Sequence, residues 1–253
     1  MIVIIILISI IYLYYQSAIP KLNRIEIKLN GEGLNLLQIS DFHSNKKALK
    51  HSKELLLNAK RLELDIIVFT GDLISRTDRD FTTVEKLLSD LKNLNIPMVF
   101  VSGNHEIENL AYKKFMKLLS NYSVKILDDC MIKIKDYNLI GLSPKNRFHR
   151  LNEIEFDRDS KNIILSHIPT NVDLNNLEGE SIILAGHTHG GQIRLPIIGQ
   201  IFTPEQPLFG GYDKGLTNLT KSIKLYIDSG LGNSKLPIRI CNRIQYTFIK
   251  IDG

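Results

Sequence analysis

Side chains that can bind metal ions or move protons occur in five short clusters along this chain of 253 residues. Each cluster directly follows a run of apolar residues, and in chain order they read SDFHSN, TGDL, SGNHE, SHIP and GHTHGG. They contain five of the seven histidines of the chain, a concentration that random placement would not produce. The candidate functional residues are Asp41, His43, Asp72, Asn104, His105, His167, His187 and His189.

Nitrogen and oxygen donors in this number are typical of divalent metal ions. Seven donors are too many for one ion and enough for two, so we predict a pair of ions that share the carboxylate of Asp72. Imidazole combined with hard oxygen ligands favours Mn, Fe or Zn over Ca or Mg. The remaining ligands divide into one set for each ion, which are Asp41, His43 and His189 for the first and Asn104, His167 and His187 for the second.

Each cluster taken alone also has a structural explanation. A Gly-Asp pair after a strand is most often a turn, and the run GNHE can begin a helix with Asn104 as its N-cap. A single histidine such as His167 is most often a hydrogen-bonded residue of the core. The joint occurrence of the clusters, each after an apolar run, favours the metal centre over these explanations.

The apolar runs predict the strands that position the clusters, and they span Leu34–Ser40, Asp65–Thr70, Pro97–Ser102, Asn162–Ser166 and Ser181–Ala185. Residues 48–62 and 80–94 carry leucines at helical spacing, and this alternation predicts an α/β fold with largely parallel central strands. The carboxyl ends of parallel strands meet at one edge, so the clusters should gather there. If the strands continue through the two D-x-H and H-x-H pairs, both members of each pair point to the same face.

Two later segments predict strands without intervening helices, at Lys224–Ile227 and Gln245–Ile251. This change favours a second, mixed sheet packed against the first. No linker divides residues 30–253, so we expect one catalytic domain over residues 21–253 and a separate segment over residues 1–20.

Residues 1–20 read MIVIIILISIIYLYYQSAIP and predict an N-terminal hydrophobic anchor helix. A helix from Ile2 to Ile19 would be roughly 27 Å long, enough to cross the core of a bilayer. No basic residue precedes the apolar run, and Gln16 disfavours cleavage after Ala18, so an uncleaved transmembrane anchor is favoured over a signal peptide or a buried element. The basic residues that follow would hold the domain in the cytoplasm, but upstream residues could reverse this signal, and the side of the membrane stays open.

The composition is that of a globular protein, with 43% hydrophobic and 23% charged residues. A net charge of +5 suits an anionic ligand or membrane surface, whereas the lysines and arginines are too scattered to predict nucleic-acid binding. Cys130 and Cys241 lie in no metal-binding spacing and are expected to be free, buried thiols. No oligomeric state follows from the sequence.

The order D-x-H, G-D, G-N-H-E, H, G-H-x-H, from Asp41 to His189, resembles the calcineurin-like metallophosphoesterase superfamily. The runs GHTHGGQIRLP and YIDSGLGNSKLPIRI are similar to its bacterial branch of membrane- or cell-envelope-associated phosphoesterases, and the similarity covers roughly residues 25–250. The resemblance implies a four-layer αββα sandwich with a dinuclear centre on the seven residues named above. It also implies that His105 is a catalytic residue and not a metal ligand.

The expected reaction is hydrolysis of a phosphate ester or pyrophosphate by water activated between the two ions. His105 would donate a proton to the leaving oxygen or hydrogen-bond to the phosphoryl group. The anchor favours a membrane- or envelope-associated substrate, either a small molecule or a lipid that carries phosphate. The alternative is a membrane-anchored, metal-dependent binding or scaffold protein without turnover, but all ligand positions and His105 are filled with competent residues, which favours the enzyme.

The chain departs from this branch after the predicted strand NLIGL. Ser143 and Pro144 stand where many relatives have an aspartate pair, which leaves the choice of substrate open. Asn146, Arg147 and His149 are weaker candidates for contacts to the leaving group, and an exposed polar loop is the alternative for them.

Overall fold

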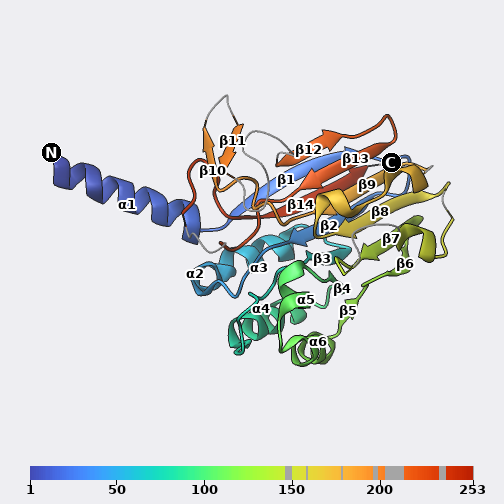
Figure 1. The fold of residues 1–253 in the computed structure, drawn as a ribbon, viewed down its shortest axis with the longest axis horizontal. Coiled ribbons are helices and arrows are strands. Elements are labelled where there is room, and N and C mark those ends of the chain that lie inside the picture. The colour runs from blue at the N-terminus through green and yellow to red at the C-terminus, as the bar shows by residue number, and fades with distance from the viewer. Residues whose placement is uncertain are drawn as a thin grey trace.

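Two six-stranded sheets form the centre of the computed structural model (Figure 1). The structure describes residues 1–145, 150–157, 159–177, 179–195, 199–202, 214–233 and 238–252. Buried aliphatic side chains from both sheets, among them Leu36, Val68, Leu165 and Leu184, form one core between them. The predicted pair of packed sheets is therefore present.

The first sheet has the strand order β1-β14-β2-β3-β4-β5, and all neighbours are parallel except β14 and β2. The strands are β1 (Lys21–Lys28), β2 (Leu34–Ile39), β3 (Ile66–Thr70), β4 (Met98–Val101), β5 (Val124–Ile126) and β14 (Gln245–Asp252). Three of the five predicted strands that carry clusters, β2, β3 and β4, lie side by side here.

The second sheet has the order β12-β13-β9-β8-β7-β6, with four parallel strands inside and an antiparallel strand at each edge. It contains the other two cluster-bearing strands, β8 and β9. Its strands are β6 (Cys130–Ile134), β7 (Tyr137–Leu142), β8 (Lys161–Ser166), β9 (Ser181–Ala185), β12 (Gly215–Asn218) and β13 (Ile223–Ile227). A small antiparallel pair, β10 (Ile193–Leu195) and β11 (Gly199–Phe202), follows the GHTHGG run.

One strand is not where the sequence placed it. β14 was predicted in the second sheet but pairs with β1 and β2 in the first. Tyr246 packs in the core under the helices, whereas Ile249 and Ile251 pack between the sheets. Because β14 is apolar on both faces, it needs an inner position, and period-two alternation does not specify in which sheet.

Helices cover the outer face of the first sheet (Figure 1). They are α2 (Lys46–Lys50), α3 (Ser52–Arg61), α4 (Thr82–Lys92), α5 (Asn104–Glu108) and α6 (Tyr112–Asn121). Asn45 caps α2, because its Oδ1 accepts hydrogen bonds from the backbone N–H groups of Lys47 and Ala48 at 3.0 and 3.1 Å. Leu87, Leu88 and Leu91 of α4 face the sheet and are buried, as the spacing predicted.

The predicted fourth layer of helices is not confirmed, because the described residues on the outer face of the second sheet contain no α-helix. The outer face of the second sheet is covered there by three single 3-10 turns, η1 (Arg150–Glu153), η2 (Pro169–Asn171) and η3 (Leu174–Asn176). Leu151, Val172 and Leu177 of these connections pack on Ile164 and Ile183 of the sheet. Short connections suffice to bury this face, so the fold is mixed α/β with two large, mainly parallel sheets.

A helix forms in the apolar N-terminal segment, α1 (Ile2–Ala18), and extends away from the sheets (Figure 1). Nowhere in the described residues is a helix both long and apolar enough to cross a membrane. The predicted transmembrane anchor over residues 1–20 is therefore not confirmed.

The C-terminal end of α1 is fixed to the segment that precedes β14. The guanidinium of Arg243 donates hydrogen bonds to the carbonyls of Ile19 and Pro20 at 2.6 and 2.9 Å. The backbone N–H of Cys241 donates to the hydroxyl of Tyr12 at 2.9 Å. Cys241 and Cys130 are free as predicted, but both are exposed and not buried.

Candidate metal centre

The five clusters meet at the carboxyl ends of β2, β3 and β4 in one sheet and of β8 and β9 in the other. All seven predicted ligands and His105 are among the described residues, and their side chains come together although the chain between Asp41 and His189 spans most of both sheets. Metal binding by these residues stays a prediction, and the distances between their donor atoms show whether they are placed to bind ions.

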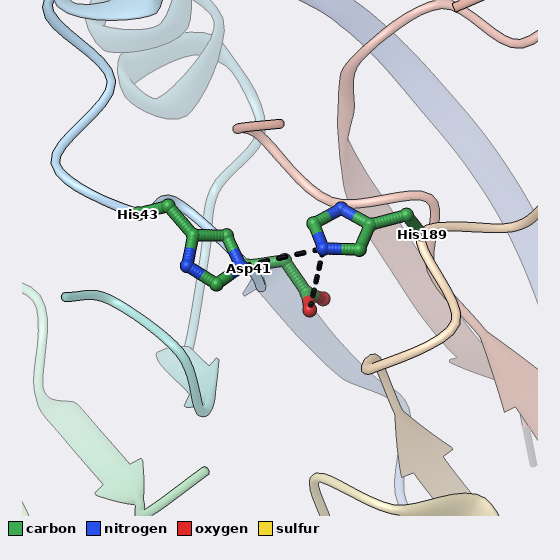
Figure 2. Close-up of side chains that lie close together, drawn as sticks. All are labelled: Asp41, His43 and His189. Carbon is green, nitrogen blue, oxygen red and sulfur yellow. Dashed lines mark hydrogen bonds and ion pairs between the residues drawn. The ribbon is translucent and has the colours of Figure 1, made fainter. Parts of the chain in front are cut away.

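The first predicted ligand set forms a close group (Figure 2). The Nε2 atoms of His43 and His189 lie 3.3 Å apart, and His189 Nε2 lies 3.8 Å from Asp41 Oδ1. Their side chains are at most 4% exposed. Two unprotonated imidazole nitrogens and a carboxylate at this separation can bind one divalent ion.

The second predicted set forms a similar group beside it. His187 Nδ1 lies 3.1 Å from Asn104 Oδ1 and 3.3 Å from His167 Nε2. The other ring nitrogen of His167, Nδ1, is 2.8 Å from the carbonyl of Thr70, to which it donates. This hydrogen bond keeps a proton on Nδ1, so that Nε2 is the nitrogen that can bind an ion once it has lost its own proton, as is usual for metal-binding histidines.

Asp72 lies between the two groups. Its Oδ2 atom is 3.2 Å from His167 Nε2 in the second group and 3.7 Å from His43 Nε2 in the first. This is the position that a shared carboxylate requires. The donor set therefore fits a pair of divalent ions.

The backbone at these positions is not extended, which corrects the reasoning that paired ligands lie on continued strands. Five predicted ligands have left-handed φ values, between 47° and 70°. Each such residue costs of order 1–3 kcal/mol and persists only where the surroundings hold it. The ligands thus project from tight turns just beyond the strands, and these five residues are Asp41, His43, Asp72, His187 and His189.

Two glycines allow these turns to pack together. A Cβ atom at Gly103 would collide with the carboxylate and backbone nitrogen of Asp72. One at Gly186 would collide with Ser40 Oγ and Asp41 Oδ2. Glycine at these places is required by close approach to the ligands.

Burial and mutual charge determine the protonation of the centre. Burial raises the pKa of Asp41 to about 7 and lowers that of His43 to about 3. Burial opposes the His167–Asp72 ion pair, but the attraction prevails, so the pKa of His167 rises to about 10 and that of Asp72 falls well below its usual range. His43 is thus neutral and ready to bind a cation, whereas an ion at the second group would have to displace the proton that His167 carries beside Asp72.

Glu106 supports the candidate centre, whereas the sequence analysis treated it only as the start of a helix. It is fully buried, and its carboxylate accepts hydrogen bonds from the backbone N–H groups of Asp72 and Gly103, both at 2.8 Å, and of Ile74 at 3.0 Å. Glu106 therefore joins the turn that carries Asp72 to the turn that carries Asn104. Its position in the GNHE run was the only feature of the sequence that pointed to this role.

His105 lies at the edge of the centre, with its side chain 18% exposed. Its Nε2 is 3.8 Å from Asp72 Oδ2, and its ring centroid is 4.6 Å from that of His43. Its Nδ1 is buried and has no hydrogen-bond partner among the described residues. The histidine is close enough to reach a group held at the centre, and its role as a proton donor stays a prediction.

The weaker candidates Asn146, Arg147 and His149 lie outside the described residues. Ser143, just before them, follows β7 and is buried. Its backbone N–H donates to Asp129 Oδ1 at 3.0 Å.

Comparison with known proteins gives consistent results. The calcineurin-like phosphoesterase family model matches residues 34–191. The chain is 30% identical over 239 residues to YkuE of Bacillus subtilis (strain 168), an uncharacterized metallophosphoesterase, covering 85% of this chain and 78% of that protein. It is 26% identical to the uncharacterized metallophosphoesterase Cj0846 of Campylobacter jejuni, covering 92% of this chain and 64% of that protein.

A dimetal phosphatase from Danio rerio has a similar fold, with a TM-score of 0.50 at 11% identity, covering 78% of this chain and 88% of that chain. The family model covers more than half of the chain and contains every candidate ligand. The chain therefore belongs to the calcineurin-like phosphoesterase family.

Proposed function

We propose that this protein hydrolyses phosphate ester or pyrophosphate bonds with water activated by a pair of divalent metal ions. The family supports a hydrolase that acts on phosphoric esters. The observation that carries the dinuclear reaction is the place of Asp72, whose Oδ2 lies within 3.7 Å of a histidine nitrogen from each ligand group.

Bound ions would acidify a water molecule and neutralise charge on the phosphoryl group. The chain's own residues would do the rest. The turns that hold Asp41, Asp72 and Asn104 fix the donors before substrate arrives, which avoids reorganisation during the reaction. His105 would donate a proton to the leaving oxygen, or hydrogen-bond to the phosphoryl group, from the exposed side of the centre.

The metals are proposed to be Mn, Fe or Zn. The seven donors are four imidazoles, two carboxylates and one carboxamide, and this mixture of nitrogen and hard oxygen suits these ions better than Ca or Mg.

The substrate is proposed to be a small molecule or lipid that carries phosphate at a membrane or cell envelope, with no role for nucleic acid. The support is α1, whose apolar side chains from Ile2 to Ile11 are each at least 52% exposed. An apolar surface of this kind favours contact with a membrane or a partner. Near its base, Arg243 stacks on Tyr15 and Lys47 lies over Tyr14, an arrangement suited to the headgroup region.

Vesicle binding tests the membrane proposal. The full chain should sediment with vesicles that contain anionic lipid, and Ile5→Asp combined with Ile8→Asp should abolish sedimentation. Leu57→Asp is the matched control, because Leu57 is also an exposed apolar residue, 54% exposed, but lies on α3. Equal sedimentation of all three proteins would contradict the proposal.

A substrate screen tests the reaction. The detergent-solubilised full chain, loaded with Mn, should hydrolyse at least one of three classes, which are lipid pyrophosphates, phosphodiesters and phosphomonoesters. If a protein with two bound ions hydrolyses none of them, the centre is a metal-dependent binding site of the same fold and the enzymatic proposal is wrong.

A further inference from the structure

Arg239 is the largest fully buried side chain of the described residues, with 0% exposure. A guanidinium remains charged in proteins, and burying it is costly unless its donors are satisfied. Within the described part of the chain none of its hydrogen bonds goes to a carboxylate. A buried positive charge without a carboxylate partner is costly, so we expect Arg239 to have a function at the candidate metal centre beside it.

The guanidinium holds His189 at two points. Its Nη2 lies 3.1 Å from the ring nitrogen Nδ1, where it can donate only to the metal-free tautomer that carries its proton on Nε2, because a ring that binds an ion through Nε2 is protonated on Nδ1. Its Nη1 donates to the backbone carbonyl of His189 at 3.3 Å. The opposite ring nitrogen, Nε2, is the one that faces Asp41 and His43. The contact that is compatible with a bound ion is therefore the hydrogen bond to the backbone carbonyl, through which Arg239 supports the left-handed turn that carries the ring.

The same guanidinium holds the segment against which Asp41 packs. Nη2 donates to the carbonyls of Ser229 and Gly232, both at 2.7 Å. In turn, the backbone N–H of Gly232 donates to the carbonyl of Asp41 at 2.7 Å. Arg239 thus supports two of the three ligands of the first group.

The second ligand group is held by other contacts. His167 donates to Thr70, and the backbone N–H of His187 donates to the carboxylate of Asp41. Among the described residues Arg239 makes no hydrogen bond to the side chains of the second group. The support it gives is asymmetric.

We propose that Arg239 is a positioning residue for one ion of the pair, the ion held by Asp41, His43 and His189. The inference rests on the proposed function in that it concerns the same metal pair. Loss of a residue that orients a metal ligand typically weakens metal binding about 10–100-fold. Replacement of Arg239 should lower the affinity for the first ion by this factor and leave the affinity for the second ion unchanged.

The test is a Co(II) titration of the full chain in detergent, followed by visible absorption and calorimetry. Arg239→Lys keeps the charge without the planar fork, and Arg239→Met removes both. Both variants should bind one Co(II) about 10–100-fold more weakly than the wild type. Arg243→Met is the matched control: Arg243 lies on the same segment but bonds to Ile19 and Pro20, so both Co(II) affinities should stay at wild-type values.

A double-mutant cycle identifies which ion is affected. In a His189→Ala background, Arg239→Lys should cause no further loss of metal affinity, because that variant has already lost the first ion. In a His187→Ala background, Arg239→Lys should lower the affinity for the ion that remains. Wild-type affinity for both ions, equal loss of both, or tighter binding by Arg239→Met through relief of charge repulsion would each overturn the proposal.

Circular dichroism of the metal-free variants checks folding, and if Arg239→Met does not fold, Arg239→Lys decides. Metal counting also separates this inference from the proposed function. A wild type that binds two ions but hydrolyses no phosphate compound would refute the enzymatic proposal and leave the role of Arg239 intact.

Discussion

The carboxylate of Glu106 accepts the backbone N–H of Asp72 at 2.8 Å, so a residue of the GNHE run holds the turn that carries the central carboxylate of the candidate metal centre. The same oxygen accepts the N–H of Gly103 at 2.8 Å. One buried acid thus connects the ends of β3 and β4, and with them ligands from both predicted ion sites.

Glu106→Gln should therefore destabilise the protein and weaken metal binding. Glutamine presents N–H donors at one of the two positions where Glu106 accepts hydrogen bonds, so one backbone donor loses its partner, at about 1–3 kcal/mol. Denaturant unfolding and metal analysis measure both effects. Glu108→Gln is the control, because Glu108 lies on the same helix, is exposed and pairs with Arg76; it should change stability by less than about 0.5 kcal/mol.

Removal of metal should abolish hydrolysis. After chelation and dialysis, the protein should not cleave a chromogenic phosphodiester, because the donors alone cannot stabilise charge on the phosphoryl group. Mn should restore activity better than Mg, since four of the seven donors are imidazoles. Full activity in protein shown by elemental analysis to be free of metal would refute the dinuclear model.

His187→Ala and His189→Ala should each lose about one metal equivalent and most of the activity. The two histidines are only two residues apart, but His187 Nδ1 faces Asn104 and His167, whereas His189 Nε2 faces Asp41 and His43. Elemental analysis after dialysis measures the loss. His51→Ala, outside the five clusters, should keep both ions; two ions retained in both site variants would show that the assignment is wrong.

The composition of the site followed from the sequence because each cluster ends an apolar run, and parallel strands bring such ends together. What the sequence could not supply was the local geometry. The left-handed turns at Asp41 and His189 depend on what packs around them, and no pattern within the turns specifies it. Arg239 lies 50 residues after His189, and only the fold reveals that it holds the turn that carries that ring.

The fold was predictable to a similar depth. Alternating strands and helices up to β4 follow a local pattern, so α4 and three strands of the first sheet, β2, β3 and β4, were found. β14 was assigned to the wrong sheet because its pairing with β1 and β2 depends on contacts between chain ends, which periodicity does not encode. The helices expected over the second sheet are not confirmed either, since an apolar sheet face can be buried by short 3-10 turns as well as by helices, and the described residues there form such turns.

The last prediction separates proton transfer from metal binding, and it concerns His105. Asn104 is a candidate ligand and Glu106 holds the backbone, so the residue between them is fixed beside the centre, and its side chain is 18% exposed. His105→Asn should keep both ions and lower turnover. The loss should be larger for alkyl esters, whose leaving oxygen needs a proton, than for nitrophenyl esters, which leave as stable anions.

From the range known for general acids, the two losses should differ by about 10- to 1,000-fold. Steady-state kinetics on the two ester classes, with metal content measured on the same samples, gives both numbers. An equal loss for both classes would assign His105 to stabilisation of the phosphoryl group instead. Loss of an ion from His105→Asn would show that His105 is a metal ligand. Its distance of 3.8 Å from Asp72 Oδ2 permits this, although the resemblance to the family implies that His105 is not a ligand.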